Sequence, residues 1–98
     1  MKRASHELEV HVDTCMEKCK HVGFNPSMFK RMRENLGTLA AIEKLVVSGE
    51  MHSGFKQLHK LGMLKWSVEA AVLKFPNEFA RAVCECAAFR LRIIKRAI

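Results

Sequence analysis

The residues best suited to chemistry are cysteines and histidines in the first part of the chain. His11, Cys15 and Cys19 follow one another at intervals of four residues, which places them along one side of a helix. Thiolate and imidazole groups bind zinc, but a structural zinc site takes four ligands that converge from more than one element. The chain contains no Cys-x-x-Cys pair, and Cys84 and Cys86, two residues apart, point to different sides of a helix. We therefore expect reduced cysteines packed within the protein, with no metal and no other cofactor.

Motifs of the common catalytic sites are absent from the sequence. There is no Gly-x-x-x-x-Gly-Lys phosphate loop, no dinucleotide-binding fingerprint and no paired-carboxylate motif. A cysteine nucleophile with a histidine base is conceivable, but nothing fixes a nucleophile, a base and an orienting group together, and a buried cysteine is inert. Glu69, an exposed carboxylate in the first turn of an expected helix, is explained by its interaction with the helix dipole. We therefore expect that the protein is not an enzyme.

The elements that would position these residues are all helical. Apolar residues recur at intervals of three and four, and Ser, Thr and Asn caps, Gly stops and prolines separate the repeats. We expect helices over residues 6–22, from an Asn25 cap and Pro26 to Leu36, from a Thr38 cap to Val47, over Ser53–Leu61, from a Ser67 cap to the Phe75–Pro76 break, and from an Asn77 cap to about Arg96. The sequence thus predicts one all-α domain, residues 1–98, folded as a compact bundle of about five to six short helices.

Apolar stripes predict which side of each helix faces the core. Phe24 and Phe29 also have the spacing of a hydrophobic staple around the start of the second helix. The inward residues expected are Met28, Phe29, Met32 and Leu36 for the second helix and Phe79, Ala82, Cys86, Phe89 and Ile93 for the last.

The chain is strongly basic, and its positive charge is unevenly distributed. Lys and Arg number 17 against 10 Asp and Glu, which gives a formal net charge of +7. Residues 1–23 carry as many acidic as basic side chains, so the surplus belongs to the rest of the chain. A field of this kind attracts polyanions and speeds encounter with them. We expect the basic side chains to form three ridges, made by Lys30, Arg31 and Arg33, by Lys56, Lys60 and Lys65, and by Arg81, Arg90, Arg92, Lys95 and Arg96.

These ridges predict an acidic partner, either the phosphate backbone of nucleic acid or an acidic protein surface. No zinc-finger, RNP or basic-zipper motif is present, and one tryptophan without any tyrosine offers few platforms for stacking bases. The leading hypothesis is a non-catalytic accessory module that engages either nucleic acid, by contacting phosphates without reading bases, or the acidic face of a protein in a nucleic-acid-processing complex. The alternative is a protein–protein interaction module whose apolar surface, rich in the six methionines, makes the contact, with the positive charge serving solubility alone.

Residues 23–91 resemble a group of small bacterial helical proteins and accessory domains that have no assigned activity. The likeness lies in the aromatic-x-Pro turn at residues 24–26, the Gly-Phe-x-x-Leu helix at residues 54–58 and the Leu-x-x-Ser-Val-Glu-Ala segment at residues 64–70. The chain departs at Lys65 and Trp66, where the group favours an acidic residue and leucine. The resemblance implies the helical fold and a bacterial or phage defence setting, but it assigns no site.

Neither a membrane span nor a secretory signal is expected. No apolar run approaches the roughly 18 residues of a helix that crosses a bilayer, and the basic start of the chain leads into polar sequence. We expect a cytoplasmic protein with no membrane partner, and the sequence allows an oligomer.

Overall fold

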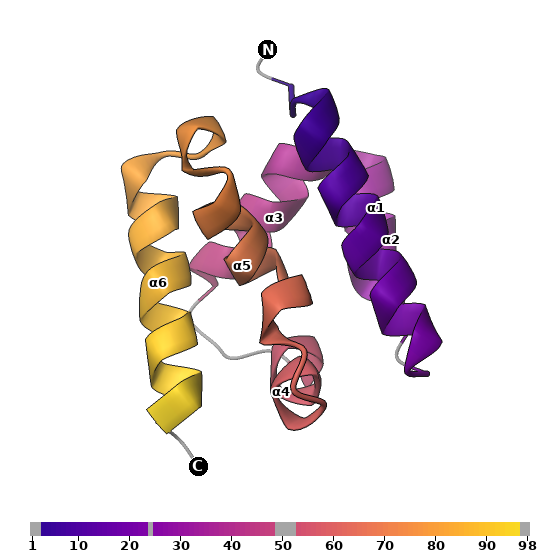
Figure 1. Ribbon diagram of the computed structural model, residues 1–98. Helices are drawn as coiled ribbons and strands as arrows, with labels where there is room; N and C mark the ends of the chain where they lie inside the picture. Colours follow the sequence, from indigo (N-terminus) through magenta and orange to yellow (C-terminus); the bar gives the residue numbers. More distant parts are fainter. Residues whose placement is uncertain (1–2, 24, 49–52, 97–98) are drawn as a thin grey trace.

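The computed structural model describes residues 3–23, 25–48 and 53–96, and this part of the chain is built from helices (Figure 1). Its α-helices are α1 (His6–His21), α2 (Ser27–Leu36), α3 (Thr38–Val47), α4 (Ser53–Lys60), α5 (Val68–Lys74) and α6 (Arg81–Arg96). Two short 3-10 helices, η1 (Leu64–Trp66) and η2 (Pro76–Glu78), come before and after α5. The predicted all-α bundle of five to six short helices is confirmed. Within the described residues, no helix combines the length and the apolar character that crossing a bilayer requires.

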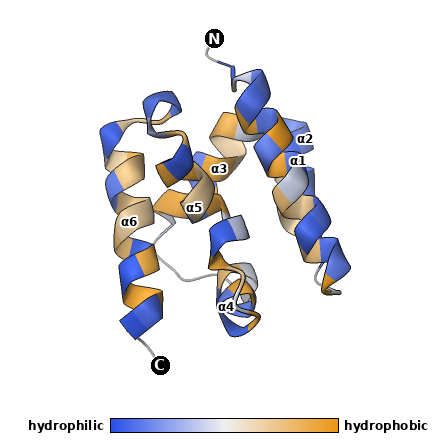
Figure 2. Ribbon diagram, viewed as in Figure 1, coloured by the Kyte–Doolittle hydropathy of each residue, from blue (hydrophilic) through white to orange (hydrophobic). Residues whose placement is uncertain are grey.

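The helices α3 and α5 lie at the centre of the molecule. α5 packs against α3, α6 and α1, and α3 also contacts α2 and α6. In Figure 1, α1 and α2 lie on one side of this pair and α6 on the other, with α4 near the end where α6 finishes. Figure 2 shows α3 as largely apolar, as expected for a helix covered by several others. The core includes Leu8, Val12, Ile42, Val46 and Val72, all of which are almost inaccessible to solvent.

Several helix boundaries follow the local chemistry that the sequence predicts. The Ser5 hydroxyl accepts a hydrogen bond from the Leu8 N–H at 3.1 Å, and the Ser67 hydroxyl accepts one from the Ala70 N–H at 3.1 Å. Both serines therefore cap helices, α1 and α5, as predicted. Gly62 follows α4 with a φ of +69°, a left-handed conformation that glycine adopts without a steric penalty.

The second helix begins later than the sequence predicts, and less of it is covered. Pro26 occupies the N-cap position without a side-chain hydrogen bond, so the predicted Asn25 cap is wrong. Phe24, half of the expected staple, lies outside the described residues. Met28 and Leu36 are exposed rather than inward, because α2 packs mainly against α3 and only one side of it is buried.

The last helix also begins later than predicted. Residues Pro76–Glu78 form η2, and α6 starts at Arg81 rather than after an Asn77 cap. The Glu78 carboxylate accepts hydrogen bonds from the backbone N–H and the hydroxyl of Ser5, which fastens this turn to the start of α1. A contact between residues far apart in the sequence therefore overrides the local preference of Asn77.

The buried side of α6 differs from the predicted one by a single position. The helix buries Val83, Ala87, Arg90 and Ile94, whereas the predicted Ala82, Phe89 and Ile93 are exposed and Cys86 is half-buried. Both sets have the helical period, but the buried set contains an arginine, which a search for apolar residues rejects. The helix is therefore rotated by about 100° from the prediction. Phe79, which precedes the helix, is buried as predicted.

Candidate functional site

Arg90, predicted to lie on a basic ridge, lies in the interior. Its Nη1 donates to Glu69 Oε2 at 3.1 Å, and its Nη2 donates to the carbonyl and hydroxyl oxygens of Ser48 at the end of α3. Glu69 is fully buried, so it is not the exposed first-turn carboxylate that the sequence suggests. An arginine is stable here because its charge is matched and its guanidinium donors meet acceptors. The prediction that Arg90 belongs to an outer ridge is wrong.

Arg33 is also committed to contacts within the protein. Its Nη2 and Nη1 donate to the carboxylates of Glu9 and Asp13 on α1, each at 2.7 Å, and its Nε donates to the Thr38 hydroxyl at 2.9 Å. The Thr38 hydroxyl donates to Glu9 instead of capping α3 as predicted. Burial alone would raise the pKa of Glu9, but the hydrogen bonds from Thr38 and Arg33 outweigh it and lower that pKa. Arg33 therefore joins α1 to the corner between α2 and α3.

Five of the predicted basic residues come to one end of the molecule. α4 packs against α6, and in Figure 1 it lies near the end of α6 that leads to the C-terminus. Neither α4 nor residues 86–96 contain an acidic residue. The exposed basic side chains of these two segments, which we name the α4–α6 basic surface, are Lys56, Lys60, Arg92, Lys95 and Arg96.

The other predicted basic residues lie elsewhere, so the three ridges do not form one continuous surface. Lys30 and Arg31 are exposed on α2, on the opposite side of the molecule from α6 (Figure 1). Arg81 is exposed at the start of α6, and its Nε lies 3.1 Å from the Glu85 carboxylate. Lys65 is exposed on η1.

Lys65 lies close to a lysine that the sequence does not single out. The Nζ atoms of Lys18 and Lys65 lie 5.3 and 5.4 Å from the centroid of the Trp66 ring, within the range of cation–π contacts. Lys18 belongs to the part of the chain with balanced charge, and no sequence signal places it beside η1. The His11 ring stacks on Trp66 with the ring centroids 6.0 Å apart, and burial, with the nearby charge of Lys74, lowers the pKa of His11. The contact between α1 and η1 therefore brings two ammonium groups together at one indole.

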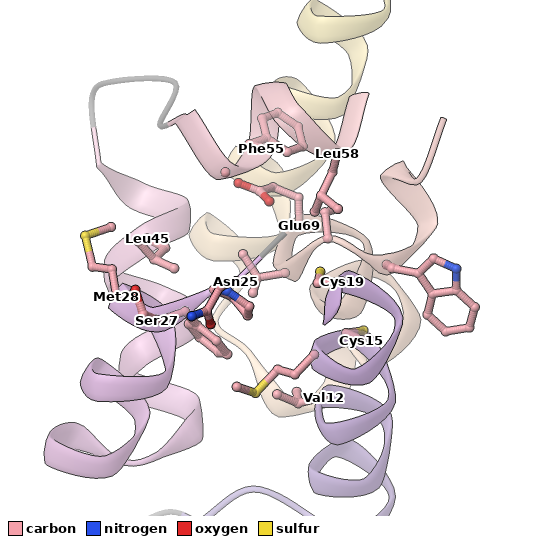
Figure 3. A pocket seen from close by; sticks show the side chains of 17 residues that line it. Val12, Cys15, Cys19, Asn25, Ser27, Met28, Leu45, Phe55, Leu58 and Glu69 are labelled. Carbon is pink, nitrogen blue, oxygen red and sulfur yellow. The ribbon is translucent and has the colours of Figure 1, made fainter. Parts of the chain in front are cut away.

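An apolar groove of about 280 Å³ lies between α1, α2, α4 and the start of α5. Figure 3 shows Cys15 and Cys19 of α1 on one side of it, Met28 of α2 on the other, and Phe55 and Leu58 of α4 toward one end. Trp66, beside the two lysines, also lines it. We name it the α1–α4 groove and define it by Cys15, Cys19, Met28, Phe55, Leu58 and Trp66. Its walls come from α1, α2, α3, α4, η1 and α5, so no single stretch of sequence predicts it.

The two thiols of the groove lie where ionisation is disfavoured. Cys15 and Cys19 are buried and carry no disulfide. Burial, with a smaller contribution from Cys19, raises the pKa of Cys15 to about 12, and burial also raises the pKa of Cys19. Such thiols hold little nucleophilic thiolate at neutral pH. In the described residues, no three or more His, Cys, Asp or Glu side chains are grouped so that they could hold a metal ion.

Within the described residues, we infer a function from the α4–α6 basic surface and the α1–α4 groove. The chain matches no family model, no curated protein and no solved structure.

Proposed function

We propose that this chain is a non-catalytic binding module that holds the phosphate backbone of nucleic acid on its α4–α6 basic surface. The observation that carries the proposal is the packing of α4 against α6, because both segments have exposed Lys and Arg side chains and neither contains an acidic residue. Lys and Arg side chains neutralise phosphates and release the condensed counterions, which drives binding. Such contacts position a protein on nucleic acid without reading its bases. The cytoplasmic setting expected from the sequence belongs to the same proposal.

Interaction with the helix dipoles explains the positions of only some of these cations. Lys60 lies in the last turn of α4, and Lys95 and Arg96 lie in the last turn of α6, where cations are favourable even without a partner. Lys56 lies in the first turn of α4, where the dipole disfavours a cation, and Arg92 lies before the last turn of α6. Substitution of Lys56 and Arg92 therefore tests binding without removing a cation that stabilises the last turn of a helix.

Charge reversal of these two residues is the test. In a fluorescence titration of labelled duplex DNA at several salt concentrations, Lys56→Glu with Arg92→Glu should weaken binding. The plot of log affinity against log salt should become less steep, with the magnitude of its slope reduced by about 1.8, because each lost phosphate contact removes about 0.9. The matched control, Lys30→Glu with Arg31→Glu, makes the same change of net charge on α2 and should leave the slope near that of the wild type.

Two outcomes would contradict the proposal. Equal losses from both pairs of substitutions would mean that net charge alone attracts the DNA and that the α4–α6 basic surface is not a defined site. If the wild type does not bind either duplex or single-stranded oligonucleotides at low salt, nucleic acid is excluded as the partner. An acidic protein surface is then the partner that the same cations favour.

A further inference from the structure

The α1–α4 groove has the size and chemistry of a site for apolar side chains. A closed cavity of about 150 Å³ accepts a benzene molecule, so the 280 Å³ of the groove holds roughly two large apolar side chains. Phe55 and Leu58 are buried around it, whereas Met28 at its edge is 60% exposed. A methionine at such an edge adapts its shape to a partner, because its side chain is unbranched and flexible.

The walls of the groove favour a helix as the occupant. Residues of α1, α2, α3, α4, η1 and α5 surround the hollow on several sides, and the lining is mostly apolar. Grooves of this kind take the apolar face of an amphipathic helix, whose anchoring side chains recur at intervals of three and four residues.

Two positive charges lie next to one of the residues that line the groove. The ammonium groups of Lys18 and Lys65 both lie at Trp66, which lines the groove. Glu69, the acidic residue among the lining side chains, is buried and paired with Arg90. An occupant with carboxylates next to its apolar face would therefore meet two positive charges at this edge.

The same charge opposes a second copy of this chain as the occupant. Each copy carries a formal net charge of +7, so two copies repel each other. The exposed apolar residues of α6, Phe89 and Ile93, are flanked by Arg92 and Lys95, which would bring further cations to Lys18 and Lys65.

We infer that the α1–α4 groove is a docking site for an amphipathic helix of a partner protein, with acidic side chains beside the apolar face of that helix. This inference goes beyond the proposed function, because Cys15, Cys19, Met28, Phe55, Leu58 and Trp66 are not part of the α4–α6 basic surface. One end of the molecule would hold a polyanion, while the groove would recruit a second protein.

Selection from a phage-displayed library of peptides about 14 residues long, roughly four helical turns, identifies what the groove accepts. We expect enriched peptides with apolar residues at i, i+3 or i+4, and i+7, and with Asp or Glu beside them. By fluorescence anisotropy, a labelled enriched peptide should bind the Met28→Glu variant on the order of tenfold more weakly than the wild type. Met28 lies in the first turn of α2, where a glutamate is favourable for the helix, so this variant should fold.

Matched controls separate the groove from general effects. Val10→Glu changes another exposed apolar residue, on α1 and outside the groove, and should leave peptide binding unchanged. Lys18→Glu with Lys65→Glu should weaken binding, whereas Lys20→Glu with Lys44→Glu, the same charge change away from Trp66, should have little effect. Met28→Glu should bind duplex DNA as the wild type does, so failure of the groove and failure of the basic surface are distinguishable.

Three results would overturn the inference. The library yields no enriched sequence, the enriched peptides lack acidic residues, or Met28→Glu weakens binding no more than Val10→Glu does.

Discussion

Arg33 and Arg90 both form ion pairs, but the pairs of Arg33 are partly exposed to water and that of Arg90 is buried. Arg33 is 19% exposed, and its partners Glu9 and Asp13 are 41% and 67% exposed, between α1 and α2. Arg90 is 8% exposed, and its partner Glu69 is 0% exposed, between α5 and α6. Water screens the first set of charges, so each exposed pair stabilises the fold little. The second set is shielded from water, so each charge depends on the other.

The difference shows how a basic composition is divided within one chain. Arg90 pairs with Glu69 in the core, and Arg33 links α1 to α2 near the surface. The guanidinium groups of both are already occupied by contacts within the protein, so neither is available to an acidic partner. Counting Lys and Arg along the sequence therefore overestimates the charge that an interface can use.

The largest expected effect comes from breaking the buried pair. Arg90→Met should reduce the free energy of unfolding by about 3–5 kcal/mol, because it leaves the Glu69 carboxylate buried without its guanidinium. Urea denaturation followed by circular dichroism measures this loss. Arg90→Met together with Glu69→Gln should lose less than Arg90→Met alone, because no unmatched carboxylate is left. A single variant within about 1 kcal/mol of the wild type would show that the pair is not a part of the core on which stability depends.

Breaking the more exposed network should cost less and should depend on pH. Arg33→Met should reduce the free energy of unfolding by about 1–2 kcal/mol at neutral pH, because it removes hydrogen bonds and partly screened pairs. The pKa of Glu9 in the folded protein is lowered from its ordinary value near 4.5. The stabilisation linked to Glu9 is therefore complete above that value and is lost as the pH falls through the lowered pKa.

Comparison of urea denaturation at neutral pH and at about pH 3 tests this sign. The difference in stability between the wild type and Arg33→Met should shrink in acid, because the lowered pKa of Glu9 in the folded wild type means that the unfolded chain takes up a proton first. A difference that stays constant or grows would mean that Glu9 is not the titrating partner of Arg33.

The parts of the fold that the sequence predicts correctly depend on neighbouring residues. The Ser5 and Ser67 caps and the break at Phe75–Pro76 each involve a few adjacent residues, and the structure has all three. The Asn77 cap failed because Ser5, at the other end of the chain, holds Glu78 in a turn. The structure thus departs from local preference where a long-range contact is stronger.

The candidate site was less predictable, because it depends on which side of each helix is buried. Arg90 occupies a position in the apolar stripe of α6, and that position is tolerable because Glu69 of α5 and Ser48 at the end of α3 supply acceptors for its guanidinium. Lys18 and Lys65 meet only because α1 crosses η1 at Trp66. The sequence places Lys18 and Arg90 on helices correctly, whereas Lys65 falls in the expected connection between two helices and lies on η1 in the structure. Pairing between elements requires the tertiary arrangement.

The smallest expected effect rests on the proposed function. It distinguishes an arginine paired within the protein from an exposed one by the salt dependence of DNA binding in the two variants. Arg92→Gln should reduce the slope of log affinity against log salt for duplex DNA by about 0.9, because one exposed cation of the α4–α6 basic surface is removed. Arg33→Gln should leave that slope unchanged, because the Arg33 guanidinium is already matched by Glu9 and Asp13 before any phosphate arrives. The two variants remove the same formal charge, so net charge cancels in the comparison. Equal reductions from both variants would show that Arg33 contacts the DNA despite its pairing with Glu9 and Asp13. If Arg92→Gln does not reduce the slope, Arg92 does not contact a phosphate.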